Sequence, residues 1–431
     1  MSTPEETWLP APILNGKPEA PPPGEAGDWK ARLIRTKYGP AAVLANAIIG
    51  FRSPEMRSVV AFDLFSLSAV IRAKAPWGSE NCTVTDHEER LAADWLQHHG
   101  VLVSPEVAGQ ALQVIAREHP VHPVREYHGG LRWDGTKRLE GWLSLYLGVE
   151  PSDYSAAVGL KFMVGAVARI DRPGVKNDCC LILEGEQGIK KSTALRVLGQ
   201  PWFTDELADL GSKDAALQTR GVWLIEIAEL DSLTRGEVSR IKAFMSRTVD
   251  RFRPPYGRHL LESPRQCVFA GSVNHNVYLR DETGGRRFWP VACTRILIDE
   301  LARDRDQLWA EAIVRYKTGA AWWLETTTLN VLAEEEQSAR YEGSAWDGLI
   351  LRWAYLQIEG GVGSVSTAEV LDRCIEKPCG QWTRADEMKV GACLRNAKWI
   401  RFKDRRQGWR YRPPVPTSGG NGLLGGNAVS D

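Results

Sequence analysis

The stretch from Cys179 to Thr193 constrains the fold more than any other part of the chain. It begins with an apolar run, breaks at Gly185, and passes through a short glycine-containing loop into Lys191 and Ser192. A helical pattern of apolar residues follows. Strand, loop and helix in this order are typical of a phosphate-binding loop, in which backbone N–H groups at the start of the helix surround a phosphate.

The residue types of this loop suit a nucleoside triphosphate. The ammonium group of Lys191 would reach the β- and γ-phosphates, and the hydroxyl of Ser192 would bind Mg²⁺. We therefore expect ATP and Mg²⁺ as cofactors. The residues expected to contact them are Gly185, Gln187, Gly188, Lys190, Lys191, Ser192 and Thr193.

The loop departs from the pattern G-x-x-x-x-G-K-[ST] at one position, because Lys190 stands where the pattern has its second glycine. If that position requires a positive φ, lysine costs roughly 1–2 kcal/mol there. Either Gly188 makes the bend instead, or Lys190 adds charge near the nucleotide. For the motif alone, a plain glycine–lysine turn before a surface helix is the alternative.

Composition narrows the class of protein. The chain has 431 residues, of which 43% are hydrophobic and 25% charged, as in a soluble protein of about two or three domains. Its formal net charge is zero, so nucleic-acid binding would depend on local patches. The acidic, proline-containing start is unlike a signal peptide, and apolar runs are too short to cross a bilayer. The cysteines and histidines lack ligand spacing. We expect a cytoplasmic protein with reduced thiols, away from membranes.

Apolar strands without alternation, at Cys179–Leu183, Val222–Ile227 and Val268–Val273, alternate with helices. Buried parallel strands have this pattern, and it predicts a three-layer α/β core. The expected divisions are a disordered segment 1–28, a helical N-terminal domain 29–118, a connector and packing helix 119–170, a P-loop core 171–325, a helical and winged-helix-like region 326–413, and a disordered tail 414–431.

Two strands of this core lead to polar residues. Glu226 and Glu229 lie at the exit of one strand, and Asn274 follows another. A nucleotide hydrolase needs one carboxylate near Mg²⁺ and one that orients or deprotonates water. We assign Glu226 to the metal and Glu229 to the water, with the reverse assignment open, and Asn274 could hold the attacking water. The alternative is an edge strand with surface acids.

Two basic segments complete the core. Arg253, Tyr256 and Arg258 lie in a predicted hairpin tip, where phosphate pairing and a stacking aromatic suit single-stranded nucleic acid. The alternative is a proline-stiffened surface loop. Arg286 and Arg287 precede a strand. An arginine that reaches the nucleotide phosphate of a neighbouring subunit would stabilise the charge of the transition state. A salt-bridged turn with the acids at positions 281 and 282 is the other interpretation.

Near the C-terminus, residues 384–412 contain ten Lys or Arg against three acids. A helix beginning after Thr383 and a following hairpin are typical of a winged helix-turn-helix that binds DNA. Ile400 and Phe402 are expected to pack inward. A basic module that docks on the core is the alternative. The residues expected to contact phosphates are Arg401, Lys403, Arg405 and Arg406.

The whole order of motifs resembles the virulence-associated protein E family of phage- and prophage-borne P-loop proteins, which are similar to superfamily 3 helicases of the AAA+ class. The resemblance is carried by residues 133–135, 183–205, 226–231, 246–258 and 279–291.

This resemblance implies an AAA+-like ATPase core in a homo-oligomeric ring that acts on single-stranded or duplex DNA, with other phage or host replication proteins as partners. Lys191 and Ser192 would bind phosphate and Mg²⁺, Asn274 would be the sensor, and Arg286 or Arg287 the finger. The expected function is an ATP-dependent DNA helicase or replication ATPase. The alternatives are an ATP-regulated DNA-binding loader or regulator that does not unwind DNA, and a degenerate nucleotide-binding scaffold.

Overall fold

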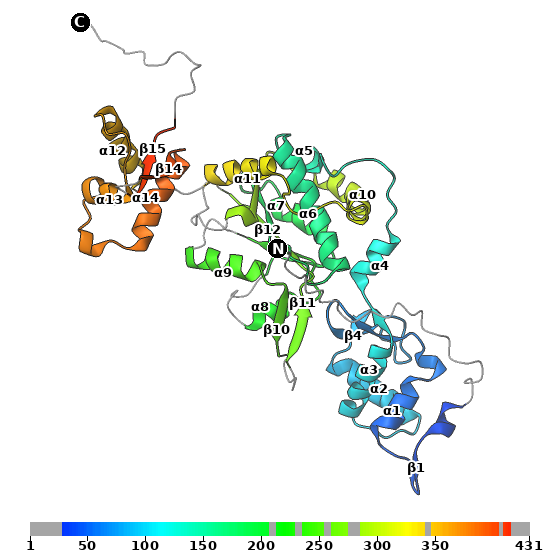
Figure 1. Ribbon diagram of the computed structural model, residues 1–431. Coiled ribbons are helices and arrows are strands. Elements are labelled where there is room, and N and C mark those ends of the chain that lie inside the picture. The colour runs from blue at the N-terminus through cyan, green and yellow to red at the C-terminus, as the bar shows by residue number, and fades with distance from the viewer. Residues whose placement is uncertain are drawn as a thin grey trace, which may run out of the picture.

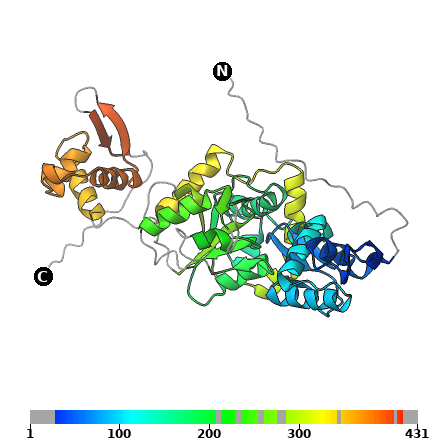
Figure 2. The same ribbon diagram turned by 90° about the horizontal axis from the view of Figure 1, so that it is seen from below.

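The computed structural model describes residues 28–206, 213–228, 235–253, 260–274, 285–340, 346–404 and 408–414. Three units follow one another along the chain: a blue N-terminal unit, a central α/β unit and an orange-to-red C-terminal unit (Figure 1). The turned view also shows the C-terminal unit set apart from the centre (Figure 2). None of the helices in the described segments is long and apolar enough to cross a membrane.

The central unit is built on a five-stranded sheet in which every neighbouring pair is parallel. From edge to edge its strands are β13 (Phe288–Ala292), β7 (Cys180–Glu184), β12 (Val268–Val273), β9 (Leu224–Ile227) and β8 (Phe203–Thr204). The parallel sheet predicted from the unalternating apolar runs is confirmed. β12 comes late in the chain but lies between β7 and β9, so it separates the strand before the predicted phosphate loop from the acidic strand.

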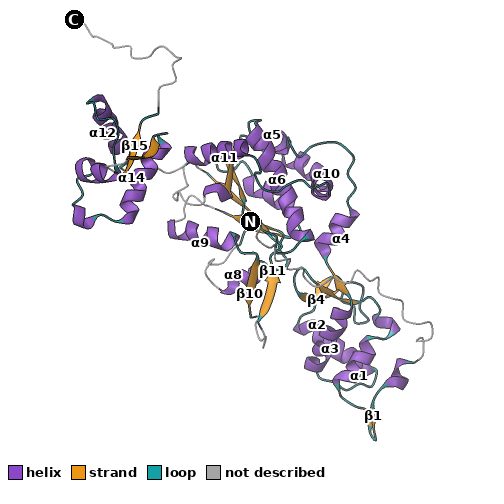
Figure 3. Ribbon diagram, in the orientation of Figure 1, coloured by secondary structure: helices purple, strands orange, loops and turns teal. Residues whose placement is uncertain are grey.

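Successive residues of β7 explain why the apolar run does not alternate. Leu181 and Leu183 enter one hydrophobic cluster, whereas Cys180 and Ile182 enter another on the opposite face. Both faces of the sheet are therefore covered (Figure 3). The first cluster includes residues of α5 (Trp142–Leu147), α6 (Asp153–Asp171), α7 (Lys191–Gly199) and α10 (Ile298–Lys317), and the second includes residues of α8 (Lys213–Gln218) and α9 (Arg235–Met245).

An antiparallel hairpin, β10 (Val249–Phe252) with β11 (Leu261–Pro264), extends from this unit as predicted. The tip of the hairpin, with Tyr256 and Arg258, lies outside the described residues. The remaining helices are α4 (Pro123–Gly130) before the sheet and α11 (Thr327–Ala339) after it.

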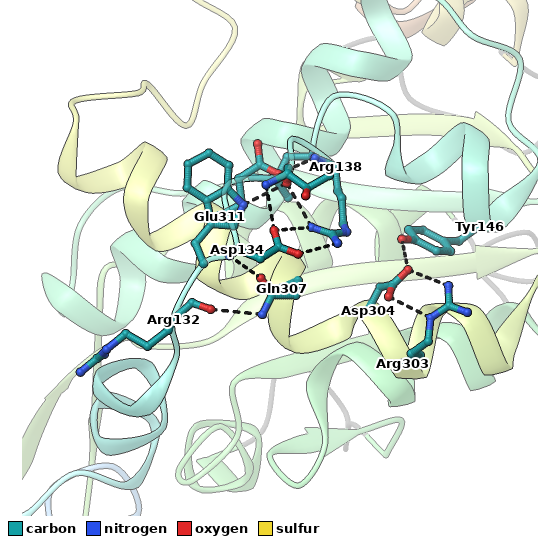
Figure 4. Close-up of polar contacts among 11 residues, drawn as sticks. Arg132, Asp134, Arg138, Tyr146, Arg303, Asp304, Gln307 and Glu311 are labelled. Atoms are coloured by element: carbon teal, nitrogen blue, oxygen red, sulfur yellow. Dashed lines mark hydrogen bonds and ion pairs between the residues drawn. The ribbon is translucent and has the colours of Figure 1, made fainter.

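Hydrogen bonds connect the segment before α5, residues 132–139, to α10 (Figure 4). Asp134 forms an ion pair with Arg138 at 2.8 Å, and the hydrogen bonds from Arg138 lower the pKa of the Asp134 carboxyl. The backbone N–H of Arg138 donates to Glu311 across 2.6 Å, and Gln307 Nε2 donates to the Arg132 carbonyl across 3.1 Å. This part of the predicted connector is thus integrated into the central unit.

The N-terminal unit is mixed, so the prediction of a helical domain is wrong in this respect. Three main helices accompany a four-stranded sheet. The strands of this sheet have four residues or fewer, and such short runs cannot be distinguished from helical segments by periodicity alone. For this reason the sequence analysis did not predict them. The elements are α1 (Leu44–Phe51), α2 (Asp86–His98) and α3 (Pro105–Glu118), with strand order β5 (Cys82–Thr83), β4 (Ser68–Ile71), β3 (Val60–Asp63), β6 (Pro120–Val121), and a small pair β1 (Arg35–Thr36) and β2 (Gly39–Pro40).

The C-terminal unit has the element order of a winged helix. Thr383 caps α14 through a capping box, as the sequence predicts, and an antiparallel hairpin follows. A single bridge between Val365 and Tyr411 adds a third extended segment to the hairpin. The elements are α12 (Asp347–Glu359), α13 (Thr367–Glu369) with a π-helical turn (Val370–Cys374), α14 (Arg384–Asn396), β14 (Ile400–Asp404) and β15 (Gly408–Arg412).

The predicted inward packing of Ile400 is wrong, since 41% of its surface is exposed, and Phe402 is only half-buried. Arg410, directly opposite Phe402, is buried and forms an ion pair with Glu369 at 2.9 Å. Tyr411, from the other face of the hairpin, enters the core instead. Arg410 and Tyr411 of β15, and not Ile400 and Phe402 of β14, are therefore the buried residues in the described part of this hairpin.

Candidate functional site

The loop that joins β7 to α7 contains three residues with positive φ. Gly185 has φ 147°, and a Cβ there would lie 2.5 Å from the carbonyl oxygen of Cys293, so only glycine fits. Gly188 has φ 87° with open space around it. Lys190 also lies in the left-handed region, at φ 76° and ψ 31°, a conformation that costs a lysine roughly 1–2 kcal/mol. The bend is thus made by Gly188 and Lys190 together.

Lys191, the first residue of α7, has a buried ammonium group at the mouth of this loop. Its Nζ donates to the carbonyls of Gly185 and Glu186, across 2.8 and 2.9 Å, and to Asn274 Oδ1 across 3.1 Å. Asn274 directly follows β12, the neighbour of β7 in the sheet. The structure therefore brings together two predicted site residues that are far apart in sequence. Exposed Gln187, Lys190 and Thr193 border the same loop.

Glu226 lies on β9 with 1% of its surface exposed. Its Oε1 accepts hydrogen bonds from Ser192 Oγ and Ser272 Oγ, each across 2.6 Å. Its Oε2 is buried and has no hydrogen-bond partner among the described residues. A buried carboxylate oxygen without a partner is costly, so this atom indicates a place for a ligand. Carboxylate and hydroxyl oxygens form the hard donor set that Mg²⁺ prefers, and the residues present fit this ion.

Ser272 was not among the predicted site residues, although the sequence contains a signal for it. Residues two apart in a strand share a face, so Ser272 projects from β12 on the same side as the following Asn274 position. A hydroxyl in an otherwise apolar, fully buried strand needs a polar partner, and Glu226 provides it.

Arg286 and Arg287 lie directly before β13, far from the loop of their own chain. Phe288 pairs with Cys180 at the first residues of their strands, whereas the loop follows Glu184 at the other end. Four strand steps of about 3.3 Å separate these ends by roughly 13 Å. Arg287 Nε contacts Asp178 Oδ2 at 3.2 Å and Ser246 Oγ at 3.0 Å. The structure therefore does not bring the arginine pair to the Lys191 site within one chain.

A buried ion pair at the end of β7 also escaped the sequence analysis. Glu184 is 1% exposed and lies 2.6 Å from Arg340 Nε, and Arg340 also contacts Glu336 on α11. Burial lowers the pKa of the Arg340 guanidinium, but the hydrogen bond and charge of Glu184, together with Glu336, outweigh this effect and raise the pKa above its usual value. The end of α11 is thereby held beside β7, the strand before the predicted phosphate loop.

The predicted nucleic-acid contacts are only partly within the described residues. Arg253, after β10, and Arg401 and Lys403, on β14, are exposed. The Arg401 guanidinium lies 4.1 Å from the ring centroid of Trp409, which is 51% exposed. The predicted residues outside the described segments are Glu229, Tyr256, Arg258, Arg405 and Arg406.

Together, the sheet and its loop define an α/β protein with a polar site at the carboxyl ends of parallel strands. Residues 129–342 match the family model of the virulence-associated protein E-like domain. This part of the chain belongs to that family, and the resemblance seen in the sequence motifs is confirmed.

Other comparisons are less informative. No curated protein matches the chain. Two apo structures of the NrS-1 C-terminal region align with 82% of this chain and with 95% and 96% of their own. Their sequence identities are 12% and 11%, and their TM-scores are 0.42 and 0.43. A likeness of this strength does not define a shared function.

Proposed function

We propose that this chain is an AAA+-like P-loop ATPase that hydrolyses ATP to act on DNA in phage or prophage replication, in the cytoplasm. The observation that carries the proposal is the buried Glu226 carboxylate. One of its oxygens accepts from Ser192 and Ser272, while the other is buried without a described partner. This carboxylate is hydrogen-bonded to Ser192 in the first turn of α7, directly after the loop. A carboxylate beside a helix N-terminus suits the binding of a metal–nucleotide complex.

The strand order supports an AAA+-like core. β12 lies between β7, which leads into the loop, and β9, which carries Glu226. It also places Asn274 3.1 Å from Lys191 Nζ. In the AAA+ class that the motifs resemble, a polar residue on such an inserted strand senses the γ-phosphate.

In this mechanism, Lys191 would neutralise phosphate charge and the α7 N-terminus would donate backbone hydrogen bonds to the phosphates. Ser192 and Glu226 Oε2 would hold Mg²⁺, which neutralises developing charge on the phosphates when bound. Asn274 would orient the attacking water. Glu229 remains the predicted residue for activating that water.

The arginine pair fits a ring assembled from copies of this chain. Arg286 and Arg287 lie at the end of the sheet opposite their own loop, so within one subunit they cannot approach the γ-phosphate. A heterologous interface would bring them to a neighbour's nucleotide. We therefore propose a homo-oligomer in which one of them acts in trans.

ATP turnover with and without single-stranded DNA tests the proposal. Lys191→Ala should abolish turnover because the charge that faces the phosphates is lost. Lys137→Ala, at an exposed position away from the loop, is the control and should keep normal activity. Normal turnover by the Lys191 variant would refute the phosphate-loop assignment. Strand displacement on a forked duplex then separates a helicase from a loader that uses ATP without unwinding.

A further inference from the structure

A cavity of about 440 Å³ lies at the edge of the sheet opposite the phosphate loop. It is bordered by the segment before β7, by the arginine pair before β13, and by the segment after α10. It is therefore separate from the Lys191 site of the same chain. We call it the tryptophan cavity, after the lining residues Trp289, Trp322 and Trp323.

The lining combines aromatic rings with positive charge. Lys176, Arg286 and Arg287 contribute three cations, against the single carboxylate of Asp178. Asp178 lies 3.2 Å from Arg287, so Lys176 and Arg286 remain as the excess charge of the lining. Flat aromatic groups beside cations suit a ligand that has both a planar ring and an anionic group.

Trp322 and Trp323 differ in how accessible their rings are to a ligand. Trp322 and Trp323 meet edge to face, with centroids 5.1 Å apart, and Trp322 Nε1 donates to the Lys176 carbonyl across 2.9 Å. That hydrogen bond fixes the Trp322 ring. Trp323 is 51% exposed, which leaves part of its ring accessible for stacking.

Trp289 adds a buried N–H donor to the lining of the cavity. It is 1% exposed, and its Nε1–H is buried without an acceptor among the described residues. A buried N–H without an acceptor is unfavourable. Nε1 of Trp77, Trp142 and Trp399 is also buried without a partner among the described residues, whereas Nε1 of Trp223, Trp309 and Trp322 each donates to a backbone carbonyl. A ligand with an acceptor atom would satisfy the Trp289 donor.

We propose that the tryptophan cavity binds one nucleotide unit, with its base against Trp323, an acceptor near Trp289, and its phosphate at Lys176 and Arg286. The nucleotide could be a free mononucleotide or one unit of a single strand, since both present the same chemistry. The inference does not depend on ATP hydrolysis at the Lys191 site.

The test uses the full chain with Lys191→Ala, which removes phosphate-loop binding. The probes are AMP, measured by calorimetry, and a fluorescein-labelled oligo(dT), measured by anisotropy. Trp323→Ala should weaken binding about tenfold, and Trp323→Phe should stay within about threefold, because stacking on an aromatic ring carries the base contact. Trp409→Ala, which has the same exposed fraction of 51%, is the control in the AMP arm and should have no effect.

Lys176→Ala gives a second readout, since only its backbone carbonyl contacts Trp322. It should weaken binding of AMP but not of adenosine. Loss of AMP binding in Trp323→Ala identifies a mononucleotide site, whereas loss of oligo(dT) binding alone identifies a strand site. The proposal is overturned if neither probe binds, if Trp323→Ala binds both probes as tightly as Trp323→Phe, or if pyrophosphate competes as well as AMP.

Discussion

Ser192 and Ser272 donate hydrogen bonds to the same oxygen, Oε1 of Glu226, each across 2.6 Å. One hydroxyl comes from α7, the helix after the predicted phosphate loop, and the other from β12, the strand beside β9. The shared acceptor fixes the carboxylate and leaves its Oε2 for a ligand. In the proposed mechanism, this pair of serines positions the oxygen that holds Mg²⁺.

Ser272→Ala should therefore raise the Mg²⁺ concentration needed for half-maximal ATPase activity and lower kcat by about tenfold, because a hydrogen bond to a charged group contributes about 1.5–3 kcal/mol. The measurement is a Mg²⁺ titration of steady-state turnover. Ser53→Ala is the control, since Ser53 is also buried but lies in the N-terminal unit. An unchanged Mg²⁺ requirement in Ser272→Ala would contradict this role.

Lys190→Gly should raise the free energy of unfolding by about 1 kcal/mol, because glycine adopts the left-handed conformation of residue 190 without strain. Denaturant titration measures the change. Lys398→Gly is a matched control, since Lys398 also has a positive φ of 62° but lies in the C-terminal unit. Both variants should be stabilised, and Lys398→Gly should not alter ATP affinity. A loss of ATP affinity in Lys190→Gly would show that this lysine contacts phosphate.

Mixing two inactive variants tests whether the arginine pair acts in trans. Subunits with Arg286→Ala and Arg287→Ala keep their phosphate loop, and Lys191→Ala subunits keep their arginines. If the proposed ring forms, mixed assemblies should recover part of the ATPase activity, since some interfaces then contain both an intact loop and an intact arginine pair. Turnover is measured against the mixing ratio, with each variant alone as control. Full activity from a species that light scattering shows to be monomeric would argue against the ring.

Exposed Arg401 and Lys403 lead us to expect that the C-terminal unit binds duplex DNA. Changing both to alanine should weaken binding and reduce the salt slope by about 1.8, since each phosphate contact contributes about 0.9. Fluorescence anisotropy over a salt series gives the slope. Truncation after Glu342 retains the Arg340–Glu184 contact, so it should preserve DNA-independent ATPase activity. An unchanged slope in the double variant would favour a docking module.

Acid should destabilise the protein through His128. Burial, with the neighbouring charges of His122, Lys317 and Arg125, lowers the pKa of His128 to about 4. The unfolded chain, with a pKa of about 6.5, then binds more protons, so stability is lost as the pH falls from about 6.5 to 4. His128→Leu should reduce this loss by about 3 kcal/mol. Melting temperatures measured across this pH range test it, with exposed His98→Leu as the control.

Sequence alone predicted four of the five sheet strands, β7, β9, β12 and β13, together with the parallel direction and the loop that precedes α7, but not the two-residue strand β8. The reason is that strands buried on both faces must be apolar throughout, as β7 shows with residues in two clusters. Helix caps such as Thr383 were equally predictable, because a cap depends on residues only a few positions apart. The family motifs likewise lie in continuous stretches of chain.

Only the tertiary structure decided which residues meet across the sheet. Strand order places β12 between β7 and β9, and this order brings Asn274 to Lys191 and Ser272 to Glu226. The positive φ at Lys190 likewise depends on the geometry of the completed loop. Local sequence patterns do not predict the order of strands in a sheet or the contacts between residues far apart in the sequence. Both depend on how helices and strands bury their apolar surfaces against one another.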